Sequence, residues 1–193
     1  SSVADQVVAE IKNEGGEAIA LKADVNSEDS IATLLKTVND QYGRIDICIS
    51  SVHRQFIPEF IVDMTWEYWN IHIEALRAHM FICKHVVPYM SAHKYGRIVY
   101  ISGGMCRRFY KGGAAYSTIK AGLNAFCKTL AMEVGLDNIM VNVVAPGRVV
   151  DDTGNITSER PDALNGTAEE EPPCENPTGR YANQKDVARS VLW

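Results

Sequence analysis

Three short apolar runs, separated by long amphipathic segments, constrain the fold of this chain most strongly. The runs cover residues 45–51, 97–102 and 140–147 and are rich in Ile and Val. Between them, apolar residues recur every three or four positions, which is helix spacing. Alternating strands and helices are typical of a parallel sheet with right-handed crossover connections. We therefore expect an α/β domain.

The same patterns predict the remaining elements. The run at 45–51 is rich in Ile, and we expect a strand buried on both faces, as in a parallel sheet. Residues 151–180 carry acidic and Pro-rich clusters with little periodicity and are expected to form a loop. A further strand is expected at 17–25, and helices are expected over residues 3–14, 28–43, 66–92, 114–136 and 184–193.

Composition narrows the class of protein. A chain of 193 residues is large enough for one domain with a real core. Its net charge of -5 disfavours nucleic acid as a partner. No apolar run reaches membrane-spanning length, and the first residues do not resemble a signal peptide. The 5 cysteines are scattered, so we expect reduced thiols in a cytoplasmic protein, with no metal site.

The candidate chemistry lies in the helix that follows Gly112-Gly113. Tyr116 and Lys120 are four residues apart, which places them one turn apart on one helix face. An ammonium near a phenol lowers the phenol pKa, so this pair could exchange protons in alcohol–ketone chemistry. The alternative is a half-buried helix tyrosine beside a solvated lysine.

The motif and its flanking strands together resemble the short-chain dehydrogenase/reductase family, over nearly the whole chain. Upstream lies Gly96-Arg97-Ile98-Val99-Tyr100-Ile101-Ser102, and downstream lies Met140-Val141-Asn142-Val143-Val144-Ala145-Pro146-Gly147. The resemblance implies a single Rossmann-like, doubly wound domain over 1–193, with a substrate lid at 151–180. It also implies hydride chemistry with NAD(P), in which Tyr116 exchanges the proton and Lys120 lowers the tyrosine pKa and binds the nicotinamide ribose.

Two other catalytic positions depart from the family pattern. The family serine, which polarises the carbonyl, falls on Gly103, and Ser102 one residue earlier should point to the other face of the strand. The family asparagine, which holds a water in the proton relay, aligns with His72. His72 could hold a water, or could be a helix histidine with no ligand role.

The cofactor positions implied by the family are partly kept. Ser50-Ser51-Val52-His53 replaces the usual Asn-Asn-Ala-Gly, whose small residues let the backbone approach the cofactor. Asp24 matches the acidic residue near the adenine, although a helix-capping carboxylate is an equal alternative. Pro146-Gly147 matches the turn that meets the nicotinamide amide, and otherwise it simply ends a strand.

The family's opening strand, Gly-rich turn and helix, and its last strand, have no counterpart in this sequence. In the family's sheet, the two strands that are missing here would lie side by side between the strand at 17–25 and the strand at 45–51. We therefore expect a doubly wound sheet that is incomplete at the N-terminus and the C-terminal strand, with exposed edges and apolar helix faces.

These departures lead to our first functional hypothesis, a catalytically degenerate, structural subunit of a hetero-oligomeric NAD-dependent dehydrogenase. The chain would bind no cofactor itself and would pair with an active homologue through helices 66–92 and 114–136. Its first helix and strand resemble the branch acting on 3-hydroxyacyl-CoA thioesters, in which heteromeric enzymes of the benzylsuccinate type occur, so the complex would act on an acyl-CoA substrate.

Two alternatives remain open at this point. The chain could be an active NAD(P)-dependent reductase that uses Tyr116 and Lys120 and whose N-terminal cofactor segment is missing from this sequence. It could also be a binding module that uses the acidic loop 151–171 for a protein partner.

Overall fold

A three-stranded parallel sheet forms the centre of the structure, a computed structural model that describes residues 2–53, 56–107, 109–151 and 180–192. Its strands are β1 (Ile47–Ser50), β2 (Gly96–Ile101) and β3 (Ile139–Val144), in the order β1-β2-β3. Cys48 pairs with Ile98, and Ile98 pairs with Val141. The three runs that the sequence analysis singled out therefore form the sheet.

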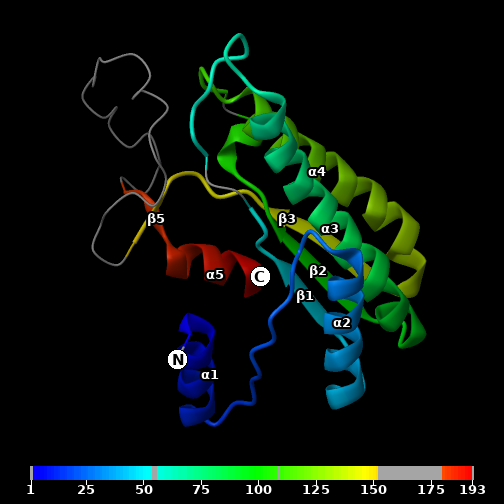
Figure 1. Ribbon diagram of the computed structural model, residues 1–193. Helices are drawn as coiled ribbons and strands as arrows, with labels where there is room; N and C mark the ends of the chain where they lie inside the picture. Colours follow the sequence, from blue (N-terminus) through cyan, green and yellow to red (C-terminus); the bar gives the residue numbers. More distant parts are fainter. Residues whose placement is uncertain (1, 54–55, 108, 152–179, 193) are drawn as a thin grey trace.

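Three helices cover one face of this sheet. These are α2 (Glu28–Tyr42), α3 (Trp66–Ala92) and α4 (Ala114–Val134), which pack in that order (Figure 1). The core between helices and sheet consists of apolar side chains that alternate along β2 and recur along the helices, namely Ile31, Leu35, Cys83, Val86, Met90, Ile98, Tyr100, Leu123, Cys127, Leu130, Val134 and Ile139. Helix α5 (Gln184–Leu192) lies on the other side of the sheet and contacts β3 (Figure 1). The structure thus confirms the Rossmann-like α/β fold.

Local sequence fixes the ends of these helices. Ser27 and Thr65 cap α2 and α3, because each side-chain oxygen accepts a hydrogen bond from the backbone N–H three residues on. Gly43 ends α2 at φ 78°, a left-handed conformation that glycine adopts at little cost. The predicted helix limits are therefore correct to within a few residues.

Helix α1 (Val3–Asn13) stands apart from this core. Its capping box at Ser2 and Asp5 is complete, yet the helix buries none of its residues. Val3, Val7 and Ile11, the apolar positions that predicted the helix, are 77%, 47% and 39% exposed. Its apolar face therefore has little cover from the described part of the chain.

The strand expected at 17–25 does not form. These residues have no regular secondary structure and pair with no strand in the described part of the chain. A β-strand is held by the ladder of hydrogen bonds to a neighbour, so strand propensity alone does not make one.

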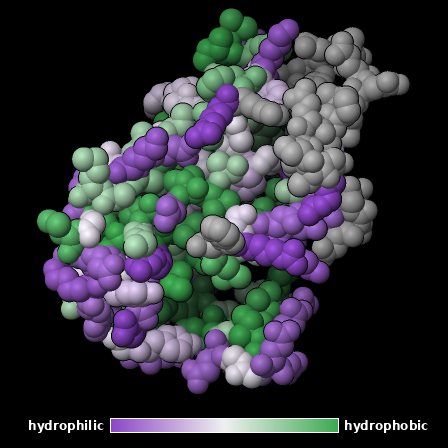
Figure 2. All heavy atoms as spheres, turned by 180° about the vertical axis from the view of Figure 1, so that it is seen from behind, coloured by the Kyte–Doolittle hydropathy of each residue, from purple (hydrophilic) through white to green (hydrophobic). Residues whose placement is uncertain are grey.

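The prediction that β1 is buried on both faces is wrong for one face. Ser50 is buried, but Ile47 and Ile49 are 60% and 54% exposed. Helices α2 to α4 cover only one side of the strand, and side chains alternate between the two sides. Figure 2, which views the molecule from behind, shows hydrophobic residues lining a hollow, so apolar surface stays open to solvent. The sheet is incomplete, as expected.

Short elements complete the chain. One-turn 3₁₀ helices, η1 (Gly104–Cys106) and η2 (Gly135–Asp137), follow β2 and α4. The short strands β4 (Val149–Val150) and β5 (Ala182–Asn183), which the sequence did not predict, pair in parallel. Almost all of the expected lid at 151–180 lies outside the described residues. Over the described ranges, no helix is long and apolar enough to cross a membrane.

Candidate active site

The candidate site lies at the carboxyl ends of strands β2 and β3. The N–H of Ser102 donates to the Val144 carbonyl at 2.8 Å, and the N–H of Gly104 donates to the Pro146 carbonyl at 2.7 Å. A Cβ atom on Gly104 would lie only 3.2 Å from that Pro146 oxygen. The absence of a side chain at Gly104 therefore lets the turn after β2 meet the turn after β3.

Helix α4 brings Tyr116 and Lys120 to this turn. The preceding Gly112 has φ +74°, which favours glycine, and Gly113 is the N-cap. A Cβ atom on Gly103 would lie 3.1 Å from the Tyr116 hydroxyl oxygen and 3.6 Å from Lys120 Cε. The residue that faces the phenol is thus a glycine, which offers no side-chain donor.

Ser102 does not replace the missing donor. Its side chain is buried, and its hydroxyl donates to the backbone carbonyl of Lys120 at 3.3 Å. This hydrogen bond ties β2 to α4. The sequence expectation that Ser102 is a poor substitute for a residue at Gly103 agrees with this contact.

Lys120 is almost completely buried, with 4% of its surface exposed. Its Nζ donates to the carbonyl of Ile101 at 3.4 Å and lies 5.3 Å from the centre of the Tyr116 ring. Burial lowers the pKa of Lys120 to about 8, and interaction with Cys106 opposes part of this shift. At neutral pH Lys120 is therefore still mostly protonated, but it loses its proton more easily than an ordinary lysine.

The expected lowering of the Tyr116 pKa is wrong for this structure. Burial raises the Tyr116 pKa above its ordinary value, because the phenolate loses its hydration. The Lys120 ammonium lies 5.3 Å from the centre of the Tyr116 ring and donates to the Ile101 carbonyl. Tyr116 is therefore a weak proton donor in this conformation.

Aromatic rings surround Tyr116. The ring of His72, on α3, meets Tyr116 edge-on with centroids 6.0 Å apart, and also meets Tyr68 at 4.9 Å. The ring of Phe56 lies 5.2 Å from Tyr116. His72 and Phe56 are both buried. His72 therefore lies beside the phenol, among the rings of Tyr68, Phe56 and Tyr116.

The sequence analysis missed His79, two turns further along α3. Its Nδ1 lies 2.8 Å from the Ser50 hydroxyl oxygen, and its ring also bonds to the backbone of Val52. Burial lowers the His79 pKa to about 4, and repulsion by Lys120 adds to this effect. The seven-residue spacing from His72 could have indicated a second histidine on the same helix face.

The remaining cofactor candidates fall in different places. The Ser50 hydroxyl is bound to His79, and Pro146 and Gly147 adjoin Gly104. Asp24 lies in the turn before α2, where its carboxylate accepts from the N–H of Asn26 at 2.9 Å. The N-cap of α2 is Ser27, so Asp24 is a local turn residue and not the helix cap that the alternative interpretation expected.

These residues fit NAD(P) only in part. Lys120 could hold ribose hydroxyls through Nζ, and Gly103 places no side chain between β2 and the Tyr116 hydroxyl. The pyrophosphate, however, needs a Gly-rich turn at a helix N-terminus, and residues 1–193 contain no Gly-x-x-x-Gly-x-Gly sequence. The described residues alone do not form a full dinucleotide site.

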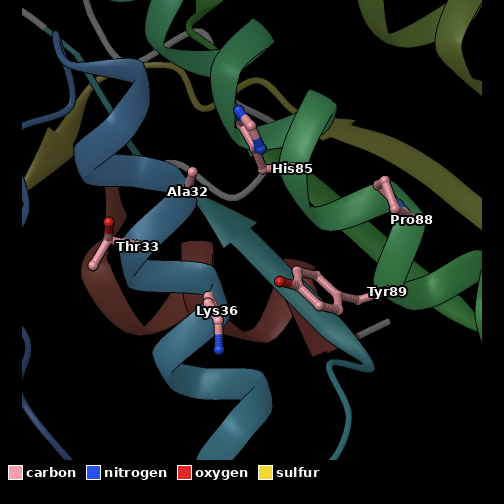
Figure 3. Close-up of a pocket in the computed structure, with 6 residues that line it drawn as sticks. All are labelled: Ala32, Thr33, Lys36, His85, Pro88 and Tyr89. Atoms are coloured by element: carbon pink, nitrogen blue, oxygen red, sulfur yellow. The ribbon is translucent and has the colours of Figure 1, made fainter.

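A depression of about 340 Å³ lies between α2 and α3, lined by Ala32, Thr33, Lys36, His85, Pro88 and Tyr89 (Figure 3). Two of its polar side chains already have partners, Lys36 with Asp40 at 2.5 Å and His85 with Glu28 at 3.0 Å. Within the part of the chain that the structure describes, no group of His, Cys, Asp or Glu could hold a metal ion.

Comparison with known proteins identifies the family. A family model described as enoyl-(acyl carrier protein) reductase matches residues 1–193. The fold agrees with a metagenomic short-chain oxidoreductase solved with NADP (TM-score 0.67, 28% identity, 74% of this chain and 65% of that one). The chain belongs to the short-chain dehydrogenase/reductase family.

Ketoacyl reductases are among the members of the short-chain dehydrogenase/reductase family that are similar to the chain. The 3-oxoacyl-(acyl-carrier-protein) reductase of Synechocystis is 37% identical over 163 residues, which is 82% of this chain and 65% of the relative. The 3-ketoacyl-ACP reductase structure from Sinorhizobium meliloti superposes with a TM-score of 0.86 at 28% identity, covering 98% of this chain and 76% of that one. The chain thus spans just under two thirds of the Synechocystis relative.

Proposed function

We propose that this chain is a catalytically degenerate subunit of an NAD(P)-dependent oxidoreductase acting on acyl thioesters in the cytoplasm. It would serve as the structural partner of an active family member and bind no cofactor by itself. The thioester class is supported by the ketoacyl reductases among its relatives. The 3-hydroxyacyl-CoA substrate of the sequence hypothesis is one form of that class.

The contact between Gly103 and Tyr116 carries this proposal. In a carbonyl reduction the developing oxyanion needs a donor beside the proton donor, and loss of one such donor costs about 100- to 1000-fold in rate. Here the position 3.1 Å from the Tyr116 hydroxyl belongs to a glycine, and the neighbouring Ser102 hydroxyl is bound to Lys120. The proton donor is present without its companion.

The electrostatics of Tyr116 support the same conclusion. Burial raises its pKa, while the Lys120 ammonium is directed to a backbone carbonyl. A general acid works best when its pKa lies near the operating pH. The pair as arranged is therefore poorly matched to proton transfer at neutral pH.

Exposed apolar side chains on α3 and α4 support a role in assembly. Ile71, Ile73 and Met80 of α3 are 42%, 37% and 39% exposed, and Met132 of α4 is 85% exposed. Side chains of this kind are favoured at subunit interfaces. Helices α3 and α4 are the surfaces that we propose for the active homologue.

Calorimetry and one substitution test the proposal. The purified chain is titrated with NADH and NADPH, and we expect no binding in the micromolar range. In a complex with an active homologue, Tyr116→Phe in this chain should leave turnover of a 3-oxoacyl thioester unchanged. Micromolar binding by this chain, or turnover lost in Tyr116→Phe, would contradict the proposal.

The placement of Tyr116 and Lys120 on one face of α4 favours a second candidate, an active reductase that uses these two residues. If it is correct, Gly103→Ser should raise kcat about 100-fold by supplying the missing donor. Gly103→Ala is the matched control, because it adds the same Cβ beside Tyr116 without a hydroxyl. Equal rates in the two variants would argue against this candidate.

A further inference from the structure

The segment that follows β1 crosses Tyr116 and is fastened at two points. We define this strap as residues 56–59. The hydroxyl of Tyr68, on α3, donates to the carbonyl of Ile57, and the N–H of Glu59 donates to the carbonyl of Gly112 at 3.0 Å. The strap is thus tied to α3 on one side and to the turn before α4 on the other.

The fastening places one side chain against the candidate proton donor. Phe56 is 8% exposed, and its ring centroid lies 5.2 Å from that of Tyr116. Tyr68 has a double role, because it fixes Ile57 through its hydroxyl and packs on His72 through its ring. The Tyr116 ring is therefore flanked by Phe56 and His72, with the Lys120 side chain nearby, and Tyr116 itself stays partly exposed.

We propose that Phe56 shields one face of the Tyr116 ring from solvent, and that a carbonyl compound approaching from that face must displace the Phe56 ring to contact the phenol. The Phe56 ring disfavours polar or hydrated groups at the face of Tyr116 that it covers. Such a group would displace the apolar contact between Phe56 and Tyr116 without making an equivalent contact. The inference rests on the proposed function only in taking Tyr116 as the proton-handling side chain.

Solvent contact at Tyr116 can be measured without turnover. The full chain is labelled with 3-fluorotyrosine, and its fluorine NMR spectrum is recorded at pH 7 with a soluble gadolinium chelate. Comparison with Tyr116→Phe identifies one resonance among those of the 8 tyrosines. In the parent chain we expect weak broadening of the Tyr116 signal and strong broadening of Tyr42, which is 40% exposed.

The variants decide the proposal. Phe56→Ala should raise the broadening of Tyr116 toward the level of Tyr42, and Tyr68→Phe, which keeps the ring but frees Ile57, should shift it in the same direction. Phe109→Ala is the matched control, since Phe109 is 73% exposed. If Phe56→Ala does not fold, Phe56→Leu takes its place.

The outcomes separate this inference from the proposed function. Unchanged broadening of Tyr116 in both Phe56 and Tyr68 variants would overturn the shield, whatever the chain does with NADH. An equal increase in Phe109→Ala would also overturn it, because the effect would then be general loosening. Binding of NADH by the parent would contradict the proposed function and leave the shielding measurement intact.

Discussion

His79 Nδ1 lies 2.8 Å from the Ser50 hydroxyl oxygen, and this buried pair joins the middle of α3 to the end of β1. The His79 ring also bonds to the backbone of Val52, so one side chain holds the corner from which the chain leaves the sheet. Ser50 and His79 are 3% and 1% exposed, so neither has water as an alternative partner. We therefore expect this pairing to stabilise the fold.

We expect His79→Phe to destabilise the fold by about 1–3 kcal/mol, because it leaves the Ser50 hydroxyl buried without a partner. His79→Gln, which keeps hydrogen-bonding atoms, should lose less. The free energy of unfolding is measured in urea, with the exposed His93→Ala as a control that should change it by less than about 0.5 kcal/mol. Equal stability of the parent and His79→Phe would contradict the prediction.

The buried imidazole also predicts a dependence on pH. The His79 pKa is about 4 in the folded chain against an ordinary value of 6.5, so the unfolded chain binds the extra proton first as pH falls. Stability should therefore fall between pH 6.5 and pH 4, with His79 contributing about 3 kcal/mol of the loss from pH 7 to pH 4. In His79→Gln the decline should be shallower by that amount. Parallel curves would refute the assignment.

Lys120 is expected to destabilise the fold, in contrast to the Ser50–His79 pair. Its pKa of about 8 lies below the ordinary 10.5, so the folded state disfavours its charge at neutral pH. We expect Lys120→Met to stabilise the fold by about 1–3 kcal/mol at pH 7, since an apolar chain replaces a poorly solvated ammonium. The gain should shrink between pH 8 and pH 10.5, where the folded lysine has lost its proton while the unfolded lysine still holds it. Thermal unfolding at both ends of that range tests it, and a destabilised variant at pH 7 would contradict it.

The two faces of the sheet predict different costs for one substitution. Ile98 on β2 is 0% exposed, whereas Ile49 on β1 is 54% exposed on the other face. Ile98→Ala should cost about 2–5 kcal/mol by leaving a cavity. Ile49→Ala should cost less than about 1 kcal/mol in the isolated chain. Denaturant unfolding of both variants compares them, and equal losses would show that a cover protects the β1 face.

Much of the fold was predictable because it depends on local signals. The apolar spacing in residues 114–136, the caps at Ser27 and Thr65, and the glycines before Tyr116 act within a few residues of where they stand. The strand at 17–25 and the second buried face of β1 were predicted wrongly. Both depend on neighbours distant in sequence that a pattern does not contain.

The sequence by itself determined that strands and helices alternate, that Tyr116 and Lys120 share a helix face, and that a glycine stands at position 103. Only the tertiary structure decided that Gly103 meets the Tyr116 hydroxyl, that burial raises the tyrosine pKa, and that His79 binds Ser50. Spacing along a helix is a property of the backbone. Desolvation and hydrogen-bond partners arise when segments far apart in sequence exclude water between them.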